Sequence, residues 1–352
     1  MVTGAGGPAG INFIKSIKLV DPRMYVIGID INRYMIHLSP ADERFIVPRC
    51  DDPTYIPTLI KIAKENDISF IHPQPDVEVA VIGVHKQQLM EEGIHTFLPS
   101  SETITICQSK YLSNQFWKKA DIPTAGSIML SKPSDVDRAF REYGSPIWIR
   151  ASSGAGGKGS TPCNNSKTAY SWMEYWKSRN RNMMFLAQEY LEGRNIGWHS
   201  LWHNGELITS MARERLEYIY PYLSPSGITG TPTVQRTIHD DAVNEVAYGA
   251  VKAIDDKYNG IACVDLKEDK DHLPRVTEIN PGRMFTTSYF FSSLSYNYLQ
   301  NNIGNFPINY LDVAFGKIPE LPPFNSLPKD IYWIRHLDIG EVMIGEDEIA
   351  NL

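Results

Sequence analysis

The sequence predicts an α/β domain followed by an α+β region, and three observations support this division. Residues 1–98 alternate strand and helix patterns, which is the order of a parallel sheet with right-handed crossover connections. From about residue 107 onward, strand patterns follow one another with fewer helices between them. The chain has 352 residues, which is enough for two or three domains that each bury a core.

The composition is that of an ordinary globular protein and excludes several classes. Apolar residues make up 42% and charged residues 21% of the chain, which excludes a disordered or collagen-like protein. The 34 basic and 41 acidic residues give a net charge of −7, so we expect no nucleic-acid partner. No apolar run reaches the roughly 18 to 20 residues of a membrane helix, so we expect no membrane partner. Four scattered cysteines without a CxxC pair fit a reducing cytosol and predict a cytoplasmic protein.

The chain opens on a glycine loop, within MVTGAGGPAG. Gly4, Gly6 and Ala9 fit G-x-G-x-x-G/A, the loop in which a Rossmann strand turns into a helix beside a phosphate. The next strand ends in Asp30, as a dinucleotide site requires. The loop therefore indicates either an NAD or FAD site or the closure of a Rossmann-like domain without dinucleotide. Only residues 1–3 precede it, whereas strands usually run about 5 to 6 residues, so we expect the natural chain to begin earlier.

Further strand and helix patterns complete the predicted first domain. A helix begins after residues 51–53, a third strand covers Ser69–His72, and a helix covers Val77–Glu92. Ligands of parallel sheets bind at the carboxyl ends of the strands. Asp76 and Glu78 follow the third strand at such an end, so both are candidate substrate-binding residues. Alternatively, Asp76 only caps the next helix.

The second region combines four helices with seven strands. The helices are predicted at 109–120, 134–143, 167–177 and 240–257, and the strands at 146–150, 184–190, 197–203, 206–213, 262–267, 275–279 and 331–337. A loop rich in proline, serine and glycine, Pro221–Thr233, interrupts the pattern.

A second glycine-rich loop follows the strand that ends at Arg150. Residues 151–160 read ASSGAGGKGS, and glycines such as Gly156 and Gly157 let backbone N–H groups converge on phosphate oxygens. Arg150 and Lys158 add two cations. The Walker A pattern G-x-x-x-x-G-K-[ST] is absent. We expect a phosphate-binding loop, with a glycine-rich hairpin as the alternative.

Three oxygen-bearing side chains on two neighbouring predicted strands point to a metal ion. Asp265 ends one strand, and Glu278 and Asn280 are two residues apart on the next, so they share a face. Mg²⁺ takes a few carboxylate or amide oxygens and completes its shell with water and nucleotide phosphate. The alternative is a solvated acidic face, but Val276 and Ile279 indicate a buried strand in which an unpaired carboxylate is costly.

In this order, the motifs resemble the ATP-grasp enzymes, which include the large subunit of carbamoyl-phosphate synthetase and many carboxylate–amine ligases. The resemblance covers roughly residues 1–316 and rests on Lys110, Arg150 with its glycine loop, Gln188–Gly193, Asp265 and Glu278–Arg283. It implies a Rossmann-like pre-ATP-grasp domain followed by a two-subdomain ATP-grasp fold. In that family the first domain needs no dinucleotide.

The resemblance also implies domain boundaries and a nucleotide site. The first domain would span 1–106, the small subdomain with the glycine loop 107–192, the C-terminal subdomain with the metal site 193–318, and an extension 319–352. The implied ATP-binding residues are Lys110, Arg150, Gly156, Gly157, Lys158, Gln188, Glu189, Tyr190, Leu191 and Asn195. Of these, Gln188 to Leu191 match the hinge strand whose backbone reads adenine. Asn195 stands where the family usually has a ribose-binding acid.

The remaining residues match metal and substrate positions. The implied Mg²⁺ ligands, which Mn²⁺ would also fit, are Asp265, Glu278 and Asn280. Arg283 is close to the arginine that follows the family's EINP motif, one place later, and would hold a carboxylate or acyl phosphate as a catalytic residue. Arg213, also assigned as catalytic, and Arg215, assigned to substrate binding, are candidates for holding the substrate anion. Solvation at the surface is the alternative for both.

The predicted activity is that of an ATP-dependent ligase. A small carboxylate would be phosphorylated by ATP and Mg²⁺ to an acyl phosphate, and an amine or ammonia would then capture it. Two alternatives stay open. A nicotinamide-dependent oxidoreductase would use the first glycine loop but would leave the second loop and the oxygen cluster without a purpose. A non-catalytic nucleotide-binding regulator is compatible with Asn195. A homodimer is compatible with the ligase interpretation.

Overall fold

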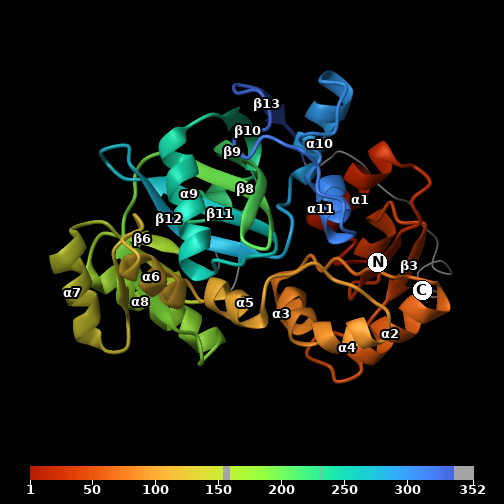
Figure 1. The fold of residues 1–352 in the computed structure, drawn as a ribbon. Coiled ribbons are helices and arrows are strands. Elements are labelled where there is room, and N and C mark those ends of the chain that lie inside the picture. The colour runs from red at the N-terminus through yellow and green to blue at the C-terminus, as the bar shows by residue number, and fades with distance from the viewer. Residues whose placement is uncertain (154–158, 231, 337–352) are drawn as a thin grey trace.

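Three β-sheets with their helices make up the chain in the computed structural model, which describes residues 1–153, 159–230 and 232–336. The first sheet has three parallel strands, whereas the other two have four and six strands. The six-stranded sheet lies between the other two parts (Figure 1). The predicted change from a parallel α/β region to an α+β region is confirmed. Among the helices of the described residues, none is long and apolar enough to cross a membrane.

The first sheet has the order β1-β2-β3 and is covered by helices on both sides. Its elements are β1 (Val2–Thr3), α1 (Pro8–Val20), β2 (Ile27–Asp30), a 3₁₀ turn (Met35–Leu38), β3 (Glu43–Ile46), α2 (Tyr55–Glu65), α3 (Asp76–Val84) and α4 (Lys86–Glu91). Ser69–His72, expected as a strand, forms only isolated bridges, one of them from His72 to Val2. The reason is that β1, the strand beside this segment, is only two residues long.

The helix predicted at Val77–Glu92 is two helices, because the backbone leaves the helical conformation at His85, which ends α3 and begins α4. The strand β3 was not expected. Its residues, Glu43–Ile46, are exposed or half-buried, so they carry little of the apolar pattern of a buried parallel strand.

The opening glycine loop is closed by the acid that follows β2. The Asp30 carboxylate accepts hydrogen bonds from the N–H groups of Gly6 (3.0 Å) and Asn32 (2.8 Å). A Cβ on Gly6 would lie 2.4 Å from the backbone of Met35, so the 3₁₀ turn covers this side of the loop. The loop amide and the carboxylate that a dinucleotide would need are therefore bonded to each other. This geometry favours the interpretation of the loop as a structural closure.

The second sheet is a four-stranded antiparallel sheet of order β4-β7-β5-β6. This part of the chain contains α5 (Ser101–Gln108), α6 (Lys110–Lys119), β4 (Ser127–Met129), α7 (Pro133–Tyr143), β5 (Ile147–Ala151), β6 (Thr161–Cys163), α8 (Ser166–Arg179) and β7 (Phe185–Glu189). The core between this sheet and α7 and α8 includes Ile128, Ile147, Met173 and Phe185. The predicted domain boundary after residue 106 falls inside α5.

The third sheet has six strands in the order β12-β11-β8-β9-β10-β13. Its part of the chain contains β8 (Asn195–His203), β9 (Glu206–Tyr218), a 3₁₀ turn (Pro221–Leu223), β10 (Pro232–Ile238), α9 (Asp241–Ile254), β11 (Gly260–Glu268), β12 (Pro274–Pro281), α10 (Ser288–Ser293), a π-helical turn (Leu294–Tyr298), α11 (Phe306–Ala314) and β13 (Tyr332–Ile334). The helix α9 packs on one face of this sheet (Figure 1). The core on that face includes Trp198, Val264 and Ile279.

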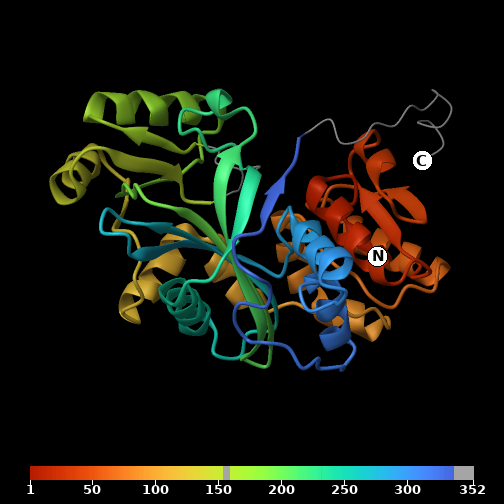
Figure 2. The same cartoon turned by 90° about the horizontal axis from the view of Figure 1, so that it is seen from above.

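The first domain is fixed to the third sheet by helices and by hydrogen bonds from buried amides. The helices α10 and α11 pack against α1, and Figure 2 shows all three between the two sheets. Gln74 Nε2 donates to the carbonyl oxygen of Met284 (2.6 Å), and Asn305 Nδ2 donates to that of Ser16 (2.8 Å). The ring of Tyr310 packs edge-on against Phe13 and His72. The carboxyl ends of the first sheet's strands are thereby held beside the end of β12.

A substitution of Asp30 tests the structural role of the opening loop. We expect Asp30→Ala to lower the free energy of unfolding by about 2 kcal/mol, because two backbone donors lose a charged acceptor. Urea denaturation measures this change. Asp256→Ala, an exposed aspartate on the turn after α9, is the matched control and should leave the urea midpoint unchanged. Equal midpoints for Asp30→Ala and the control would contradict the closure.

Candidate active site

One face of the third sheet carries a row of polar residues across four strands. Glu278 of β12 lies opposite Asp265 of β11, Asp265 opposite Gly197 of β8, and Gly197 opposite Arg213 of β9. Side chains alternate along a strand, so the residues next to these along each strand face α9 on the other side of the sheet. A bulge at Thr277 sends Val276 into that core while Glu278 faces the cleft. The sheet thus separates a helix-covered apolar face from a polar one.

A cavity of about 750 Å³ lies over this polar face, between the three parts of the chain. The sequence-predicted residues that line it are Asp76, Lys110, Arg150, Gln188, Glu189, Tyr190, Leu191, Asn195, Arg213, Arg215, Asp265, Glu278, Asn280 and Arg283. They come from the first domain, from the second and third sheets, and, in the case of Lys110, from helix α6. Gly156, Gly157 and Lys158, which were also predicted, lie outside the described residues.

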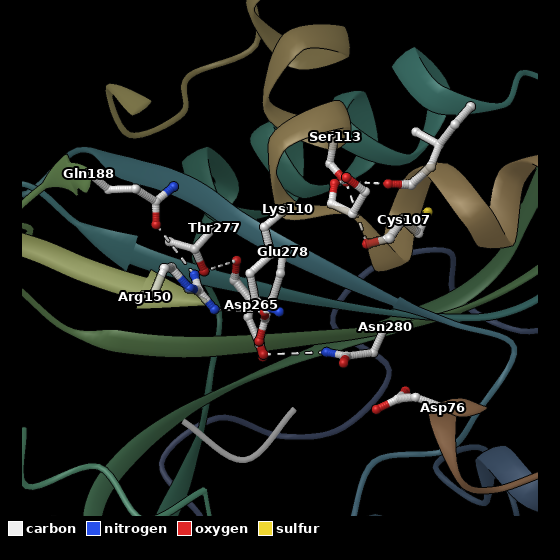
Figure 3. A network of polar contacts seen from close by, with 12 residues as sticks. Asp76, Cys107, Lys110, Ser113, Arg150, Gln188, Asp265, Thr277, Glu278 and Asn280 are labelled. Carbon is white, nitrogen blue, oxygen red and sulfur yellow. Dashed lines mark hydrogen bonds and ion pairs between the residues drawn. The ribbon is translucent and has the colours of Figure 1, made fainter. Parts of the chain in front are cut away.

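Glu278 binds two cations that come from the small subdomain (Figure 3). Its Oε2 lies 2.8 Å from an N–H of Arg150, at the end of β5, and 3.3 Å from Nζ of Lys110, the first residue of α6. All three side chains are largely shielded from solvent. Burial would raise the pKa of Glu278, but the charges of Lys110 and Arg150 lower it below its usual range. The carboxylate therefore stays ionised in this interior position.

Asp265 pairs with Arg215, which reaches it across the intervening strand. The second N–H group of Arg215 donates to Asn195 Oδ1 (2.7 Å), and Asn280 Nδ2 lies 3.4 Å from Asp265 Oδ2. A Cβ on Gly197 would lie 3.0 Å from the guanidinium of Arg215, so the missing side chain leaves room for this path. Burial opposes the charge of Arg215, but Asp265 raises its pKa above the usual range. Arg215 therefore remains charged.

Arg283 connects the metal-ligand candidates to the first domain. Its guanidinium forms an ion pair with Asp76 and donates to Asn280 Oδ1 (2.6 Å). Asp76 is the first residue of α3, and its carboxylate points away from its own helix toward Arg283. The sequence analysis assigned Asp76 to substrate binding and Arg283 to holding a carboxylate, and the structure brings the two side chains into direct contact.

Glu78, which was predicted beside Asp76, lies elsewhere. Both residues are on helix α3, where positions two apart point in nearly opposite directions, so only Asp76 can face the cavity. Glu78 is buried inside the first domain, and its Oε2 has no hydrogen-bond partner among the described residues. The sequence analysis began the helix at Val77, after Asp76, and so did not apply the helical spacing to this pair of residues. We therefore do not count Glu78 among the residues of the cleft.

The oxygen donors fit a divalent cation. Two carboxylates and one amide, from Asp265, Glu278 and Asn280, lie together on neighbouring strands, and hard cations prefer such oxygens. Among the described residues, no group of three His, Cys, Asp or Glu side chains could hold a metal ion. The set therefore suits an ion such as Mg²⁺ that obtains part of its shell from water or phosphate.

Two residues of the cleft had no assigned role in the sequence analysis. His199 of β8 is buried and lies face to face with Phe285, with 3.5 Å between ring centroids. Its Nε2 accepts a hydrogen bond from Nε of Arg213 (2.9 Å). Burial lowers the pKa of His199 well below its usual value, and Arg213 lowers it further, so the imidazole is neutral. The alternation along β8, which puts Asn195 and His199 on one face, was the available signal for His199.

Known proteins with similar sequences are ligases and carboxylases. The family described as PylC-like, N-terminal domain, matches residues 5–97. Biotin carboxylase of Pseudomonas aeruginosa is 26% identical over 159 residues, which is 44% of this chain and 35% of that protein. Phosphoribosylamine–glycine ligase of Listeria monocytogenes is 27% identical over 208 residues, which is 56% of this chain and 49% of that protein. The chain thus spans between about a third and a half of these relatives.

Solved structures match nearly the whole chain. The biotin carboxylase domain of the Hydrogenobacter thermophilus 2-oxoglutarate carboxylase has a TM-score of 0.69 at 17% identity, covering 94% of this chain and 72% of that one. Carboxyaminoimidazole ribonucleotide synthase of Aspergillus clavatus has a TM-score of 0.66 at 15% identity, covering 95% and 79%. These matches confirm the predicted fold and the resemblance to the ATP-grasp enzymes.

The buried position of Glu78 predicts a pH-dependent stability. Burial raises the pKa of this carboxyl to about 7, whereas the unfolded chain ionises it near 4.5. The folded state therefore holds a proton that the unfolded state has lost, and the protein loses about 3 kcal/mol of stability as pH rises from 5 to 8. Urea midpoints at a series of pH values measure this loss.

Glu78→Gln should remove most of that loss, because the amide cannot ionise, and should be more stable than the natural chain at pH 8. Glu245→Gln, an exposed residue of α9, is the matched control. If the natural chain and Glu78→Gln have parallel pH profiles, Glu78 ionises normally in the folded protein.

Proposed function

We propose that this chain, which has the ATP-grasp fold, is an ATP-dependent ligase that joins a small carboxylate to an amine or to ammonia. The carboxylate would first be phosphorylated by ATP to an acyl phosphate. One observation carries the proposal: Lys110 and Arg150 meet Glu278 at the edge of the oxygen cluster formed with Asp265 and Asn280. A nucleotide polyphosphate with its cation needs both kinds of group, and few other ligands do.

Known complexes support the choice of nucleotide and metal. The Hydrogenobacter domain was solved with MgADP, the Aspergillus synthase with ATP, and a related Staphylococcus aureus synthetase with ADP. In this chain, the segment from Gln188 to Leu191, which includes the ring of Tyr190, would line the adenine end of the cleft. Asn195 would face the ribose. Mg²⁺ or Mn²⁺, held by Asp265, Glu278 and Asn280, would neutralise phosphate charge.

The residues of the chain then account for the first step. A carboxylate oxygen of the acid attacks the γ-phosphorus as the bond to the β-phosphate oxygen breaks, giving ADP and an acyl phosphate. Lys110 and Arg150 stabilise the charge that develops on the phosphate oxygens, and Arg283 holds the reacting carboxylate beside Asn280. Such transfers need little covalent help, because positioning and fixed charges supply most of the rate.

In the second step, the amine nitrogen attacks the acyl carbon. The bond between that carbon and the phosphate oxygen breaks, and inorganic phosphate leaves. Asp76, which pairs with Arg283, would keep the first domain against the reacting carboxylate during both steps. The first domain would therefore form part of the substrate pocket while its glycine loop has a structural role.

The opening loop argues against an oxidoreductase, because its Gly6 amide is already bonded to Asp30. A non-catalytic nucleotide-binding regulator would use the same cations and metal-type ligands, so formation of ADP is the measurement that distinguishes the ligase from it. We also propose a cytoplasmic protein, because the four cysteines are all free. A homodimer is proposed because the Hydrogenobacter domain was solved as a dimer.

Isothermal titration calorimetry tests the nucleotide site. We expect ATP with Mg²⁺ to bind, ATP alone to bind more weakly because Asp265 and Glu278 then face the phosphates without a cation, and NAD⁺ not to bind. ADP formation with a panel of amino acids and small carboxylates then tests turnover. Binding of NAD⁺ without binding of ATP would exclude the ligase.

A substitution of Glu278 tests the metal site. Glu278→Gln should reduce ADP formation at least ~100-fold, since one charged ligand is lost, while the circular dichroism spectrum stays that of the natural chain. Glu245→Gln, on the exposed face of α9, should keep full activity. If Glu278→Gln also keeps full activity, Glu278 does not hold the metal.

A further inference from the structure

Arg213 is a buried cation that lacks a counterion within the described ranges. Two other arginines line the same end of the cavity, and each has an acidic partner: Arg215 pairs with Asp265, and Arg283 pairs with Asp76. Arg213 is 2% exposed, and its NH1 group has no hydrogen-bond partner among the described residues. Three guanidinium groups and two carboxylates leave one positive charge at this end of the cleft.

The surroundings of Arg213 orient its charge without neutralising it. Nε donates to the neutral ring of His199 (2.9 Å), and the guanidinium lies 5.4 Å from the centroid of the Phe285 ring. Burial, and after it the charge of Arg215, lowers the pKa of Arg213 to about 9, so the side chain is still protonated at pH 7. A buried charge without a partner is costly, and proteins retain one where a ligand supplies the missing charge.

Arg213 and the arginine proposed to hold the reacting carboxylate are held by different residues. That carboxylate would lie at Arg283, which is hydrogen-bonded to Asn280 of the metal-ligand set. Arg213 comes from β9, at the other end of the polar row from Glu278, and is held by His199. The cavity has a volume of about 750 Å³, which is more room than ammonia needs. Its lining includes the apolar side chains of Ala9, Pro75, Val77 and Ile228.

We propose that Arg213 binds the carboxylate of an amino acid, whose amino group is the nucleophile of the second step, and that His199 is the positioning residue that aims Arg213. This inference rests on the proposed function. The amino nitrogen forms the new bond to the acyl carbon, the bond from that carbon to the phosphate oxygen breaks, and the amine proton leaves with the phosphate. The amino acid's own carboxylate stays on Arg213 and does not react.

The experiment compares amino acids with their α-carboxamides, which lack the charge that Arg213 would bind. Calorimetric titrations of the proteinogenic L-amino acids and of their α-carboxamides are made into the chain saturated with MgADP. We expect at least one amino acid to bind about 10- to 100-fold more tightly than its carboxamide, the range of a charged hydrogen bond. Equal binding of acid and amide, or no binding of any amino acid, would overturn the inference.

Variants of Arg213 decide whether the discrimination comes from this residue. Arg213→Met should abolish the preference for acid over amide, Arg213→Lys should keep part of it, and the control Arg236→Met, on β10, should keep all of it. The urea midpoint of Arg213→Met should not fall below that of the natural chain, since an uncompensated buried charge is removed. A preference that survives in Arg213→Met would refute the assignment.

The role of His199 is tested by the same ratio. His199→Phe removes the acceptor of the Arg213 Nε–H group, so the acid-to-amide preference should fall, and His199→Gln, which has an acceptor, should restore part of it. A residue that only fills space would change both affinities equally. Titration of ATP with Mg²⁺ into the natural chain distinguishes failure of the proposed function from failure of this inference. Absence of nucleotide binding contradicts the ligase. Nucleotide binding without a preference for acid over amide contradicts only the amino-acid site.

Discussion

The pairing of half-buried carboxylates with cations from distant segments is the interaction on which this molecule depends. Glu278 and Asp265 lie on the polar face of the central sheet, where an unpaired charge would be costly. Lys110 and Arg150 come to Glu278 from the small subdomain, and Arg215 comes to Asp265 across β8. The small subdomain and the sheet are thus joined through the same groups that would hold the nucleotide and its metal ion.

The first domain is joined to the same site by a second charge pair. Asp76 binds Arg283 at the end of β12, and buried amides such as Gln74 hold the neighbouring backbone. In contrast, the glycine loop at the start of the chain is occupied by Asp30 and covered by a turn. A motif associated with dinucleotides is therefore closed within the first domain, and this domain contributes Asp76 to the cavity instead.

Much of the fold followed from periodicity, and the exceptions have physical reasons. The helices α6 to α9 and five of the six strands of the central sheet were predicted because their apolar residues repeat at the helical or strand period. The sixth, β10, was missed, because its start was taken as part of the loop Pro221–Thr233. The strand β3 was missed because it is partly exposed, and the helix break at His85 follows Gly83, a signal that the sequence analysis did not use. Glu78 was misplaced because the sequence analysis began the helix at Val77, whereas Asp76 is also part of α3 and the two side chains face different sides of it.

The sequence by itself determined the chemical types at the site, because metal ligands, phosphate-binding cations and a glycine-rich loop are recognisable from residue types and spacing. Only the tertiary structure decided which charges neutralise each other. Arg213 and Arg215 are two residues apart on one strand, yet Arg215 reaches Asp265 because Gly197 leaves space, while Arg213 turns to His199 and keeps its charge. Such pairings depend on strand order and register, which join residues far apart in the chain.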